Sequence, residues 1–372
     1  MNFDLTEDQA LLKAAVERFV ADSYGGDLEA RRAARITPAG FAAAHWTRLA
    51  QSGILALPVS AENGGLGGGR VELMTAMETM GRGLVAEPVL DVAVVAGSLL
   101  DAAGTAVQHG AVLEPLITGT MIVALAHAER EARYNLAHVA TTARRRGDRV
   151  VIDGAKVAVL AGGPADMLIV SARESGDVRA VDGIGLWLVA VDAPGVDRRP
   201  YRLADGSVAA EITLRGVEIA AGDELRGGLA ALLPVVATAR LAAATEMLGL
   251  MTLLFDTTLA YVKTRTQFGQ PLGGFQVIQH RMTDAYVLVE QARSQVMRAA
   301  LAPDADFARA AAGAKAFVGD AALTVAHTAV QLHGGMGITD ELVIGHALKR
   351  IRVLALTFGD GTAALDAYRR AA

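Results

Sequence analysis

The C-terminal part of the chain consists almost wholly of long apolar segments with the spacing of α-helices. Four of them are readable: Leu232 to Thr264, Phe275 to Leu301, Phe307 to Leu332 and Glu341 to Leu356. Their apolar residues extend nearly all the way round each predicted helix, so other helices or another subunit must cover them. Their lengths and pattern predict a four-helix bundle that is buried against something else.

The middle of the chain, from about Gly119, has the two-residue period of β-strands. The segments MIVALAH, DMLIVSAR, GIGLWLVAVDA and AAEITLRGVEI have the length of strands and are separated by turn residues. The segment RVVIDGAKVAVLAG is interpreted as a hairpin with its turn at Asp153-Gly154, because this pair tolerates positive φ. The basic cluster from Arg144 to Arg146, just before this segment, is interpreted as a solvated turn.

The first part of the chain is predicted to be helical. Thr6 and Gln9 fit a capping box, in which each side chain satisfies a backbone donor of the first helical turn. The glycine-rich stretch from Glu62 to Arg70 lacks the spacing and the flanking strand of a dinucleotide-binding fingerprint and is interpreted as a turn. The sequence therefore predicts an α+β protein with an N-terminal helical domain (residues 1–118), a middle β domain (119–228) and a C-terminal four-helix bundle (229–372).

Composition and charge exclude several classes of function. The formal net charge is -5 with acids and bases interspersed, which argues against nucleic-acid binding. The chain has no cysteine, so disulfides, thiol catalysis and cysteine metal sites are excluded, and we expect no metal site. The stretch MNFDLTEDQ shows no signal peptide and no uncharged apolar run reaches about 18 residues, so we expect a cytoplasmic protein without a membrane span. The hydrophobic share of 52% instead suggests large subunit interfaces.

Two short motifs interrupt the apolar segments of the C-terminal part. The first, RTQFGQPLGGFQ (Arg265 to Gln276), places a permanent cation and Phe268 between two predicted helices. The second, QLHGGMGIT (Gln331 to Thr339), places two adjacent glycines after a helix. A guanidinium offers a fixed fork of donors that suits a pyrophosphate, an aromatic ring packs on a flat cofactor, and glycine lets a backbone approach one closely.

With this order of domains, the two motifs resemble the acyl-CoA dehydrogenase family. Both stand in the family's order and at about its spacing, and the resemblance covers nearly the whole chain. The stretches EREARYNLAHVATTARR (Glu129 to Arg145) and TFGDGTAALDAYRR (Thr357 to Arg370) look closest to the small subunit of pimeloyl-CoA-type dehydrogenases.

The resemblance implies FAD as the cofactor and assigns contacts to it. In the family, the arginine and phenylalanine of the first motif reach the FAD of a neighbouring subunit, and the glutamine that opens the next helix lies near the same cofactor. Positions of the second motif contact FAD, and the threonine of the family's C-terminal EGT signature is matched here in GDGT. Carried over, the expected cofactor-binding residues are Arg265, Phe268, Gln276, Gln331, Gly334, Gly335 and Thr362.

The activity that the resemblance implies is the α,β-dehydrogenation of an acyl-CoA thioester. A carboxylate removes the α-proton, the β-hydrogen leaves as a hydride to the flavin, and electrons then pass to an electron-transferring flavoprotein. The expected partners are therefore an acyl-CoA, that flavoprotein, and either a larger homologous subunit or further copies of the chain in a tetramer.

The sequence departs from the family where the catalytic base is expected. The base of many members is the glutamate of EGT, and the matching residue here is Asp360, which is one methylene shorter. A misplacement of about 1 Å can cost on the order of a hundredfold in rate. Another branch of the family has a glutamate before the arginine that here is Arg240, but Ala239 stands at that position. Glu246, about 10 Å further along the helix, is interpreted as a buried structural carboxylate rather than a base.

The residues that cradle the flavin in the family's β domain also differ. Ala158 and Leu160, after Lys156, stand where the family has a tryptophan and a threonine, so a hydroxyl contact is missing. His127 is either a replacement polar contact or a histidine that is satisfied at the end of a strand.

These departures favour one function and leave others open. The chain keeps residues that serve a partner's cofactor and weakens those of its own site, which favours the small subunit of a heteromeric acyl-CoA dehydrogenase. The alternatives are a self-sufficient homotetramer that uses Asp360, a flavin-free scaffold subunit, and a flavin monooxygenase with the same fold.

Overall fold

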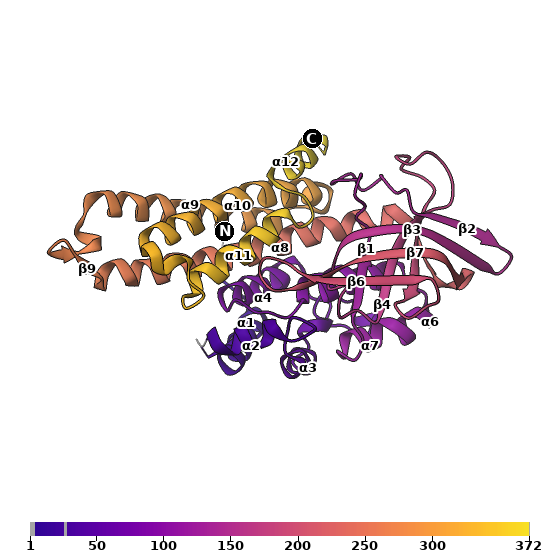
Figure 1. The fold of residues 1–372 in the computed structure, drawn as a ribbon, viewed down its shortest axis with the longest axis horizontal. Helices are drawn as coiled ribbons and strands as arrows, with labels where there is room; N and C mark the ends of the chain where they lie inside the picture. Colours follow the sequence, from indigo (N-terminus) through magenta and orange to yellow (C-terminus); the bar gives the residue numbers. More distant parts are fainter. Residues whose placement is uncertain (1–3, 26–27, 372) are drawn as a thin grey trace. The chain divides into compact units, whose positions relative to one another are not determined.

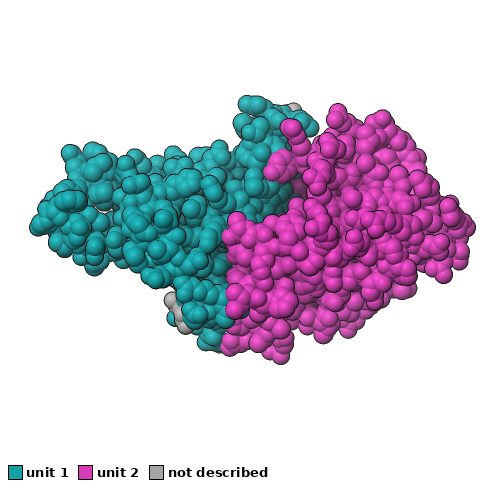
Figure 2. All heavy atoms as spheres, viewed as in Figure 1, with its two compact units in different colours: residues 1–33, 70–85, 240–372 teal, residues 34–69, 86–239 magenta. Residues whose placement is uncertain are grey.

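The computed structural model describes residues 4–25 and 28–371. Its contacts divide the chain into two compact units, each built from segments that lie far apart in the sequence (Figure 2). Unit 1 comprises Met1–Ala33, Arg70–Val85 and Arg240–Ala372, and unit 2 comprises Ala34–Gly69 and Ala86–Ala239. Some of the N-terminal helices therefore belong to unit 1 and the others to unit 2. The domain boundaries given above stay predictions.

Unit 1 is helical. Its elements are α1 (Glu7–Tyr24), the first part of α2 (Leu28–Ile36), α4 (Arg70–Arg82), α8 (Gly228–Thr264) from Arg240 onward, α9 (Gln276–Ala300), α10 (Asp304–His333), α11 (Val343–Leu356) and α12 (Gly361–Arg370). Helices α9, α11 and α12 all pack against α10 (Figure 1). The buried face of α10 is mostly alanine, and small side chains let neighbouring helices approach closely. The predicted C-terminal helical bundle is confirmed.

The first helix begins as the sequence predicts. Gln9 N donates to Thr6 Oγ1 at 3.3 Å, and Thr6 N donates to Gln9 Oε1 at 3.0 Å, which together form a capping box. The same device recurs in unit 2 with Thr105 and Gln108.

Two glycines fix the crossing of α4 and α8 in unit 1. A Cβ on Gly81 would lie 2.1 Å from the carbonyl oxygen of Glu246, and a Cβ on Gly249 would lie 2.1 Å from the carbonyl oxygen of Glu78. Each glycine therefore lets the other helix approach to backbone contact. An added methyl group cannot be relieved by a side-chain rotation, because the obstacle is backbone.

Replacing Gly81 tests this crossing. Gly81→Ala should lower the free energy of unfolding by about 1–3 kcal/mol or more, because the two backbones must separate, and urea unfolding measures the change. Gly319→Ala is the matched control: this helical glycine of α10 has no atom within 4 Å of an added Cβ, so alanine should be neutral or stabilise by up to about 1 kcal/mol. Equal stabilities of Gly81→Ala and the unmodified protein would contradict the close crossing.

Unit 2 contains an eight-stranded sheet among the described residues. The strands are β1 (Val123–Ala126), β2 (Thr142–Arg146), β3 (Arg149–Leu160), β4 (Met167–Arg173), β5 (Ile184–Ala190), β6 (Val196–Arg202), β7 (Val208–Ala220) and β8 (Glu224–Leu225). Their order is β6-β7-β3-β2-β4-β5-β8, and β1 pairs with β4 in parallel. The helices of the unit include α3 (Ala43–Gln51), α5 (Ser98–Ala103), α6 (Ala106–Gln108) and α7 (Glu114–Ile117), with π-helical stretches at Leu90–Gly97 and His109–Leu113, and the unit also holds the end of α2 and the start of α8. The predicted middle β domain is confirmed.

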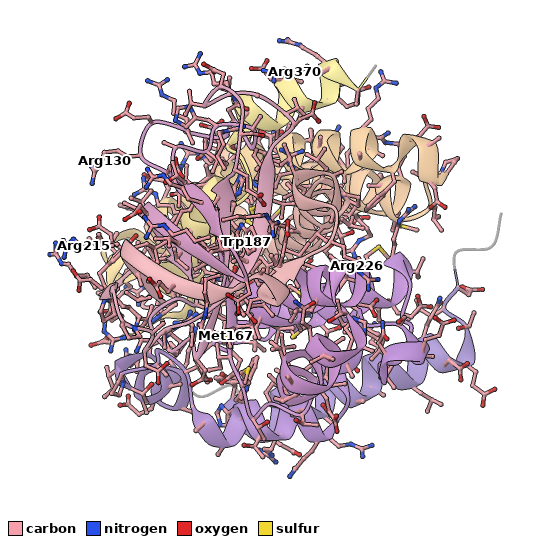
Figure 3. All side chains as sticks on the ribbon, turned by 90° about the vertical axis from the view of Figure 1, so that its right-hand side faces the viewer. Arg130, Met167, Trp187, Arg215, Arg226 and Arg370 are labelled. Carbon is pink, nitrogen blue, oxygen red and sulfur yellow. The ribbon has the colours of Figure 1, made fainter. Side chains whose placement is uncertain are left out.

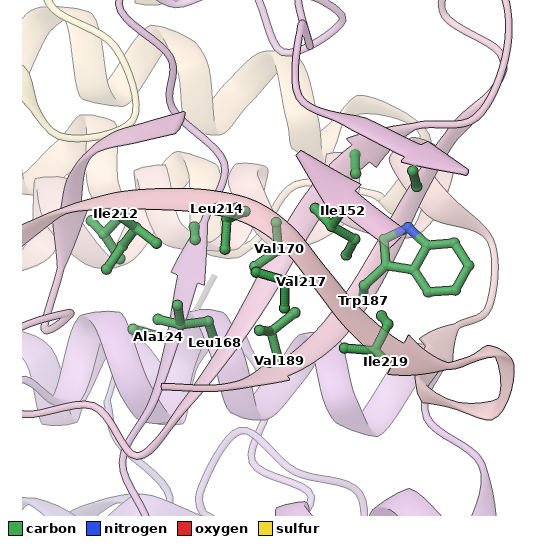
Figure 4. Close-up of a cluster of buried hydrophobic side chains, with 14 of the residues drawn as sticks. Ala124, Ile152, Leu168, Val170, Trp187, Val189, Ile212, Leu214, Val217 and Ile219 are labelled. Atoms are coloured by element: carbon green, nitrogen blue, oxygen red, sulfur yellow. The ribbon is translucent and has the colours of Figure 1, made fainter. Parts of the chain in front are cut away.

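The sheet buries one cluster of apolar side chains (Figure 4). Its members come from β1 to β5 and β7 and include Ile152, Leu168, Val189 and Ile212. They recur at every second position of a strand, as in Leu168 and Val170, because successive side chains of a strand face opposite sides of the sheet. At the surface of the same unit, the side chains of Arg130 and Arg215 point outward (Figure 3).

The prediction of a hairpin turn at Asp153-Gly154 is wrong. Strands β2 and β3 are the two arms, and the chain reverses at Gly147 and Asp148, where Gly147 has φ 63°. Asp153 and Gly154 lie inside β3, where the register against β7 shifts, as at a β-bulge. Glycine is required at position 154 because a Cβ there would lie 2.4 Å from Thr141 Oγ1.

The basic cluster also differs from its interpretation, because its arginines form most of strand β2 rather than a turn. Arg145 binds the carboxylate of Glu174 through two hydrogen bonds of 2.9 and 3.1 Å, and Arg144 donates to Asp153 at 3.3 Å. The cluster is therefore exposed but partly neutralised by carboxylates of the same unit.

By length and composition alone, α8 could cross a membrane, and it is the only such helix in the described part of the chain. Its most apolar stretch has a mean hydropathy of 1.6, and 61% of that stretch is buried within the protein. Because the core helix of a soluble protein passes the same test, this is weak evidence for a span.

Candidate functional site

A short hairpin joins α8 to α9 and exposes the first motif. Strands β9 (Thr266–Gln267) and β10 (Gln270–Pro271) pair antiparallel, with Phe268 (φ 55°) and Gly269 (φ 82°) between them. Positive φ at both residues suits a two-residue hairpin but costs a non-glycine residue about 1–2 kcal/mol. Phe268 is nevertheless 90% exposed. An aromatic ring held in solvent on a strained backbone indicates a surface that another molecule or subunit covers.

Arg265 stands at the base of this hairpin. Its backbone is fixed, because its N–H donates to Tyr261 O at 2.8 Å and its carbonyl accepts from Leu272 N at 2.9 Å. Its exposed guanidinium has no hydrogen-bond or ion-pair partner among the residues that the structure describes. A positioned cation without a carboxylate is suited to an anionic ligand.

The second motif forms the turn η7 (Gly334–Ile338) directly after α10. Gly334 has φ 60° and ψ -139°, a conformation that is essentially open to glycine only. A Cβ on Gly334 or on Gly335 would meet nothing within 4 Å in the chain. These glycines therefore serve the backbone conformation and leave an open surface, rather than allowing close packing within the subunit. Gln331 is exposed beside them.

The structure brings the two motifs to one end of unit 1. Val262 near the end of α8, Met282 near the start of α9 and Leu332 at the end of α10 belong to one buried cluster. Gln276, the first residue of α9, is exposed at the same end. All the expected cofactor-binding residues except Thr362 therefore share this end.

Asp360 and Thr362 lie elsewhere, at the start of α12: Asp360 is its N-cap, and Thr362 is in its first turn. Lys315 of α10 contacts the turn before α12 through Gly359 O at 2.8 Å. Lys315 precedes His333, the last residue of α10, by 18 positions (333 − 315), which is roughly 27 Å of helix. Within one subunit, the structure does not bring the GDGT turn together with the exposed hairpin.

Two cations hold the backbone just before Asp360. Lys315 Nζ donates to the carbonyls of Ala355 and Gly359 at 2.9 and 2.8 Å, and Arg240 Nε donates to Phe358 O at 3.0 Å. Burial lowers the pKa of Lys315 to about 8, with a further lowering from Arg240. A lysine within the apolar segment of α10 was a signal for this contact, but the sequence does not show what it binds.

The carboxylate of Asp360 caps helix α12. Its Oδ1 accepts from Ala363 N at 2.8 Å, and its backbone is extended, as is usual for an N-cap. Thr362 is exposed in the first turn of the same helix. One oxygen of the predicted base is therefore engaged with the backbone.

Glu246 is a buried structural carboxylate. It accepts from Arg350 Nε at 2.6 Å and from Arg350 Nη2 at 3.0 Å, a bidentate pair between α8 and α11. Both of its oxygens accept from Arg350 in this pair, which is a structural role.

In unit 2, Lys156 lies at the centre of a buried polar network. Its Nζ donates to Glu129 Oε1 at 2.7 Å and to Ser171 Oγ at 2.9 Å, and Glu129 also accepts from the hydroxyl of Thr141 at 2.7 Å. Burial alone would raise the pKa of Glu129, but Lys156 and the backbone donors of Ala140 and Thr141 lower it to about 2. The pair is thus ionised at neutral pH. Sequence reasoning missed it, because 27 residues separate the partners.

His127 belongs to the same network and is satisfied within the sheet. His127 Nδ1 lies 2.9 Å from Ser171 Oγ, the same hydroxyl oxygen that accepts from Lys156 Nζ. Burial, aided by Lys156, lowers the pKa of His127 to about 3, so the ring is neutral. A satisfied histidine at the end of a strand, one of the two interpretations above, is therefore observed.

The segment of β3 that matches the family's flavin cradle has an irregular backbone. Ala158 has φ 49° and Ala161 has φ 53°, and the register against β7 shifts between Lys156 and Val159. Leu160 offers no hydroxyl. This strand presents backbone and aliphatic groups where a polar side-chain contact would be needed.

The hairpin end of unit 1 fits FAD. Its unpaired guanidinium, exposed ring and two glycines open to solvent match a pyrophosphate, a flat ring system and a close backbone approach. Arg265, Phe268, Gln276, Gln331, Gly334 and Gly335 would hold it. When bound, FAD supplies the hydride acceptor of a dehydrogenation.

Helices before and after a β domain, together with a hairpin end that fits FAD, are the features of a flavin-dependent oxidoreductase. Three family models show to which family the chain belongs. The chain belongs to the acyl-CoA dehydrogenase family, because the models of its N-terminal, middle and C-terminal domains match residues 6–120, 124–217 and 226–370. FAD is the cofactor of this family, which acts on a CH–CH bond of acyl-CoA.

Individual relatives agree over nearly the whole chain. The chain is 29% identical to the probable acyl-CoA dehydrogenase YngJ of Bacillus subtilis, covering 98% of this chain and 97% of the relative. It is 28% identical to a variant of the Tcur3481-Tcur3483 steroid ACAD, with a TM-score of 0.86 and coverage of 98% and 97%. A structure of PigA with FAD and proline has a TM-score of 0.92 at 23% identity, and the match covers 100% of this chain and 98% of that chain. This match shows that the two proteins share a fold.

Replacing Glu129 tests the buried network. Glu129→Gln should lower the free energy of unfolding at neutral pH by about 3–5 kcal/mol, because Lys156 stays buried without its counter-charge. Since folding lowers the pKa of Glu129 from 4.5 to about 2, its stabilising contribution is complete above about pH 5 and is lost as the pH falls toward 2. Urea unfolding from pH 7 to pH 2 should therefore show a shallower acid loss in the variant.

The exposed Glu218 of β7 offers the matched control. Glu218→Gln should leave both the stability and its acid dependence close to those of the unmodified protein. Identical acid curves for Glu129→Gln and the unmodified protein would contradict the buried ion pair.

Proposed function

We propose that this chain is the small subunit of a heteromeric, FAD-dependent acyl-CoA dehydrogenase, similar to the pimeloyl-CoA type. In the reaction of the family, a carboxylate takes the α-proton of the thioester, the β-hydrogen leaves with its electron pair to the cofactor, and a C=C bond forms. The electrons then pass to an electron-transferring flavoprotein. The base belongs to a larger homologous subunit, and this chain supplies contacts to the cofactor.

The observation that carries the proposal is the engagement of Asp360. Its carboxylate is shorter than the family's glutamate and already caps α12 through Ala363 N. The other carboxylate near a family base position, Glu246, is paired with Arg350 through both oxygens. Asp360 thus keeps only one oxygen outside its cap among the described contacts, and Glu246 has both oxygens engaged, which disfavours each of the two as the general base.

The exposed hairpin end supports a role in binding the FAD of a neighbouring subunit. Phe268 and Arg265 are exposed at the end of unit 1 where α10 ends, and this end of α10 is roughly 27 Å of helix from Lys315, which holds the GDGT turn. This separation from the chain's own base position supports a role for these residues in the site of another subunit.

Exposed apolar residues on α9 support association. Val277, Tyr286 and Val287 are 59%, 52% and 44% exposed, and Phe317 of α10 lines the same open groove as the last two. Apolar groups clustered on one helix are covered when subunits assemble. The Tcur3481-Tcur3483 enzyme, whose name joins two components, is consistent with a mixed assembly.

A self-sufficient homotetramer with Asp360 as its base is the second candidate. It is favoured by the rigid placement of Asp360, whose preceding backbone is held by Lys315 and Arg240. Only Oδ1 of Asp360 is used in the cap among the contacts of the described residues.

Asp360→Asn separates the two candidates. Asparagine caps a helix as well as aspartate does, so the small-subunit proposal expects unchanged stability and turnover within about twofold when the variant is assembled with its larger homologue. Turnover of an acyl-CoA by the purified assembly is the measurement. Loss of turnover both alone and with the homologue would refute the proposal and favour the homotetramer.

Arg265 tests the cofactor contact. Arg265→Ala should reduce the FAD bound per assembly, measured by the flavin absorbance of the purified protein, because the bidentate contact to the pyrophosphate is lost. Arg265→Lys should also reduce it, since a point charge does not reproduce the planar fork. Arg18→Ala, an exposed arginine of α1, is the control. Full occupancy in Arg265→Ala would overturn the assignment.

A further inference from the structure

One residue of the second motif is not accounted for by contact with the cofactor. His333 stands between Gln331 and the glycine pair, but its side chain is 5% exposed and points into unit 1. Its Nδ1 lies 2.9 Å from Ala329 O, and because a carbonyl only accepts, this nitrogen carries the proton. The ring is therefore held by its own helix in one orientation.

The face of the His333 ring packs on Tyr261 of α8. The two ring centroids are 4.3 Å apart and the planes are inclined by 22°, which is a stacked arrangement. Tyr261 is also the residue whose carbonyl accepts the N–H of Arg265 at 2.8 Å. One side-chain contact thus connects the end of α10, where the glycine turn begins, with the last turn of α8, where the hairpin begins.

Phe268, Gly334 and Gly335, the outermost residues of the two elements, are exposed. Gly334 and Gly335 have no neighbour within 4 Å of an added Cβ, and the ring of Phe268 at the hairpin tip meets the ring of Phe275 edge-on, at 6.2 Å between ring centroids. Their relative position must come from the residues just behind them. The ring pair and the small cluster around Val262 are those residues.

We propose that Tyr261 and His333 are positioning residues, which hold the Arg265 hairpin and the Gly334-Gly335 turn in the relative placement that FAD binding requires. This inference rests on the proposed function, because it takes both elements as cofactor contacts. A ligand that touches two elements is bound more tightly when their separation is fixed in advance, since less conformational freedom is lost on binding.

The size of the effect follows from the stack. Aromatic pairs contribute about 0.5–1.5 kcal/mol beyond the area they bury, so loss of the pair should weaken FAD by about two- to tenfold. The effect acts through Arg265 and the glycine turn, and it should therefore vanish where those contacts are already absent.

The experiment measures the dissociation constant of FAD for the purified assembly, from the recovery of flavin fluorescence on dilution. His333→Ala and Tyr261→Ala should each weaken FAD by about two- to tenfold, whereas Tyr261→Phe keeps the ring and should bind FAD as the unmodified protein does. Adding His333→Ala to Arg265→Ala should weaken FAD less than it does alone, because residues that act as a unit are not additive.

A purely structural role is separated by a control that destabilises the same helix at its other end. Phe307, at the other end of α10, is 7% exposed, so Phe307→Ala destabilises the bundle without touching the ring pair. It should lower the melting temperature and leave the FAD constant unchanged. If His333→Ala does not fold, Tyr261→Leu, which keeps apolar bulk at a half-buried site, takes its place.

The outcomes distinguish the two claims. Suppose that Arg265→Ala weakens FAD binding, while the ring variants bind FAD normally or have an effect that simply adds to that of Arg265→Ala. The positioning role is then overturned, and the proposed cofactor contact stands. If Arg265→Ala itself leaves FAD affinity unchanged, the proposed contact fails whatever the ring variants do.

Discussion

The organisation of unit 1 depends on the need to cover α8, whose apolar surface extends nearly all the way round the helix. Each neighbouring helix meets it differently: α4 through backbone contact at Gly81 and Gly249, α11 through the ion pair with Arg350, and α9 and α10 at its last turns. These contacts use glycine, a buried charge pair and small apolar clusters in turn. Because they fix α8 along its length, the position of the hairpin that follows it is fixed as well.

Three buried cations of the chain are satisfied by partners within it, whereas the exposed guanidinium of Arg265 is not. Lys156 is paired with Glu129, Arg350 with Glu246, and Lys315 with two backbone carbonyls. Each of these cations is neutralised or satisfied within the chain, as burial of a charge requires. The guanidinium of Arg265 has no such partner among the described residues, although its backbone is well anchored. A guanidinium without a described partner, on a backbone that is anchored at the base of the hairpin, is available for a ligand.

The parts of the fold that could be predicted from the sequence are those with a strong local period. The long helices were found because apolar residues repeat along them, whereas β6 was missed because its sequence, VDRRPYR, is polar and its residues are mostly exposed. The dipeptide Asp153-Gly154 has the composition of a turn but lies in a bulge, since Gly154 is required by the approach of Thr141 from elsewhere in the chain.

In the candidate site, too, some residues could be predicted from the sequence and others could not. Its exposed motif residues were recognisable because they interrupt an apolar pattern, and the capping role of Asp360 was readable from its place before a helix. The contacts of Lys315 and the network around Lys156 depend on residues distant in the chain. No local pattern could assign their partners.

The central claim is that this chain contributes to a flavin site which a larger homologue completes. It is tested most directly by comparing the flavin absorbance and the mass of the chain purified alone with those of the chain co-expressed with such a homologue. We expect a colourless protein when the chain is purified alone and a flavin-containing mixed oligomer on co-expression. A yellow homo-oligomer whose flavin is bleached by an acyl-CoA, formed by this chain alone, would contradict it.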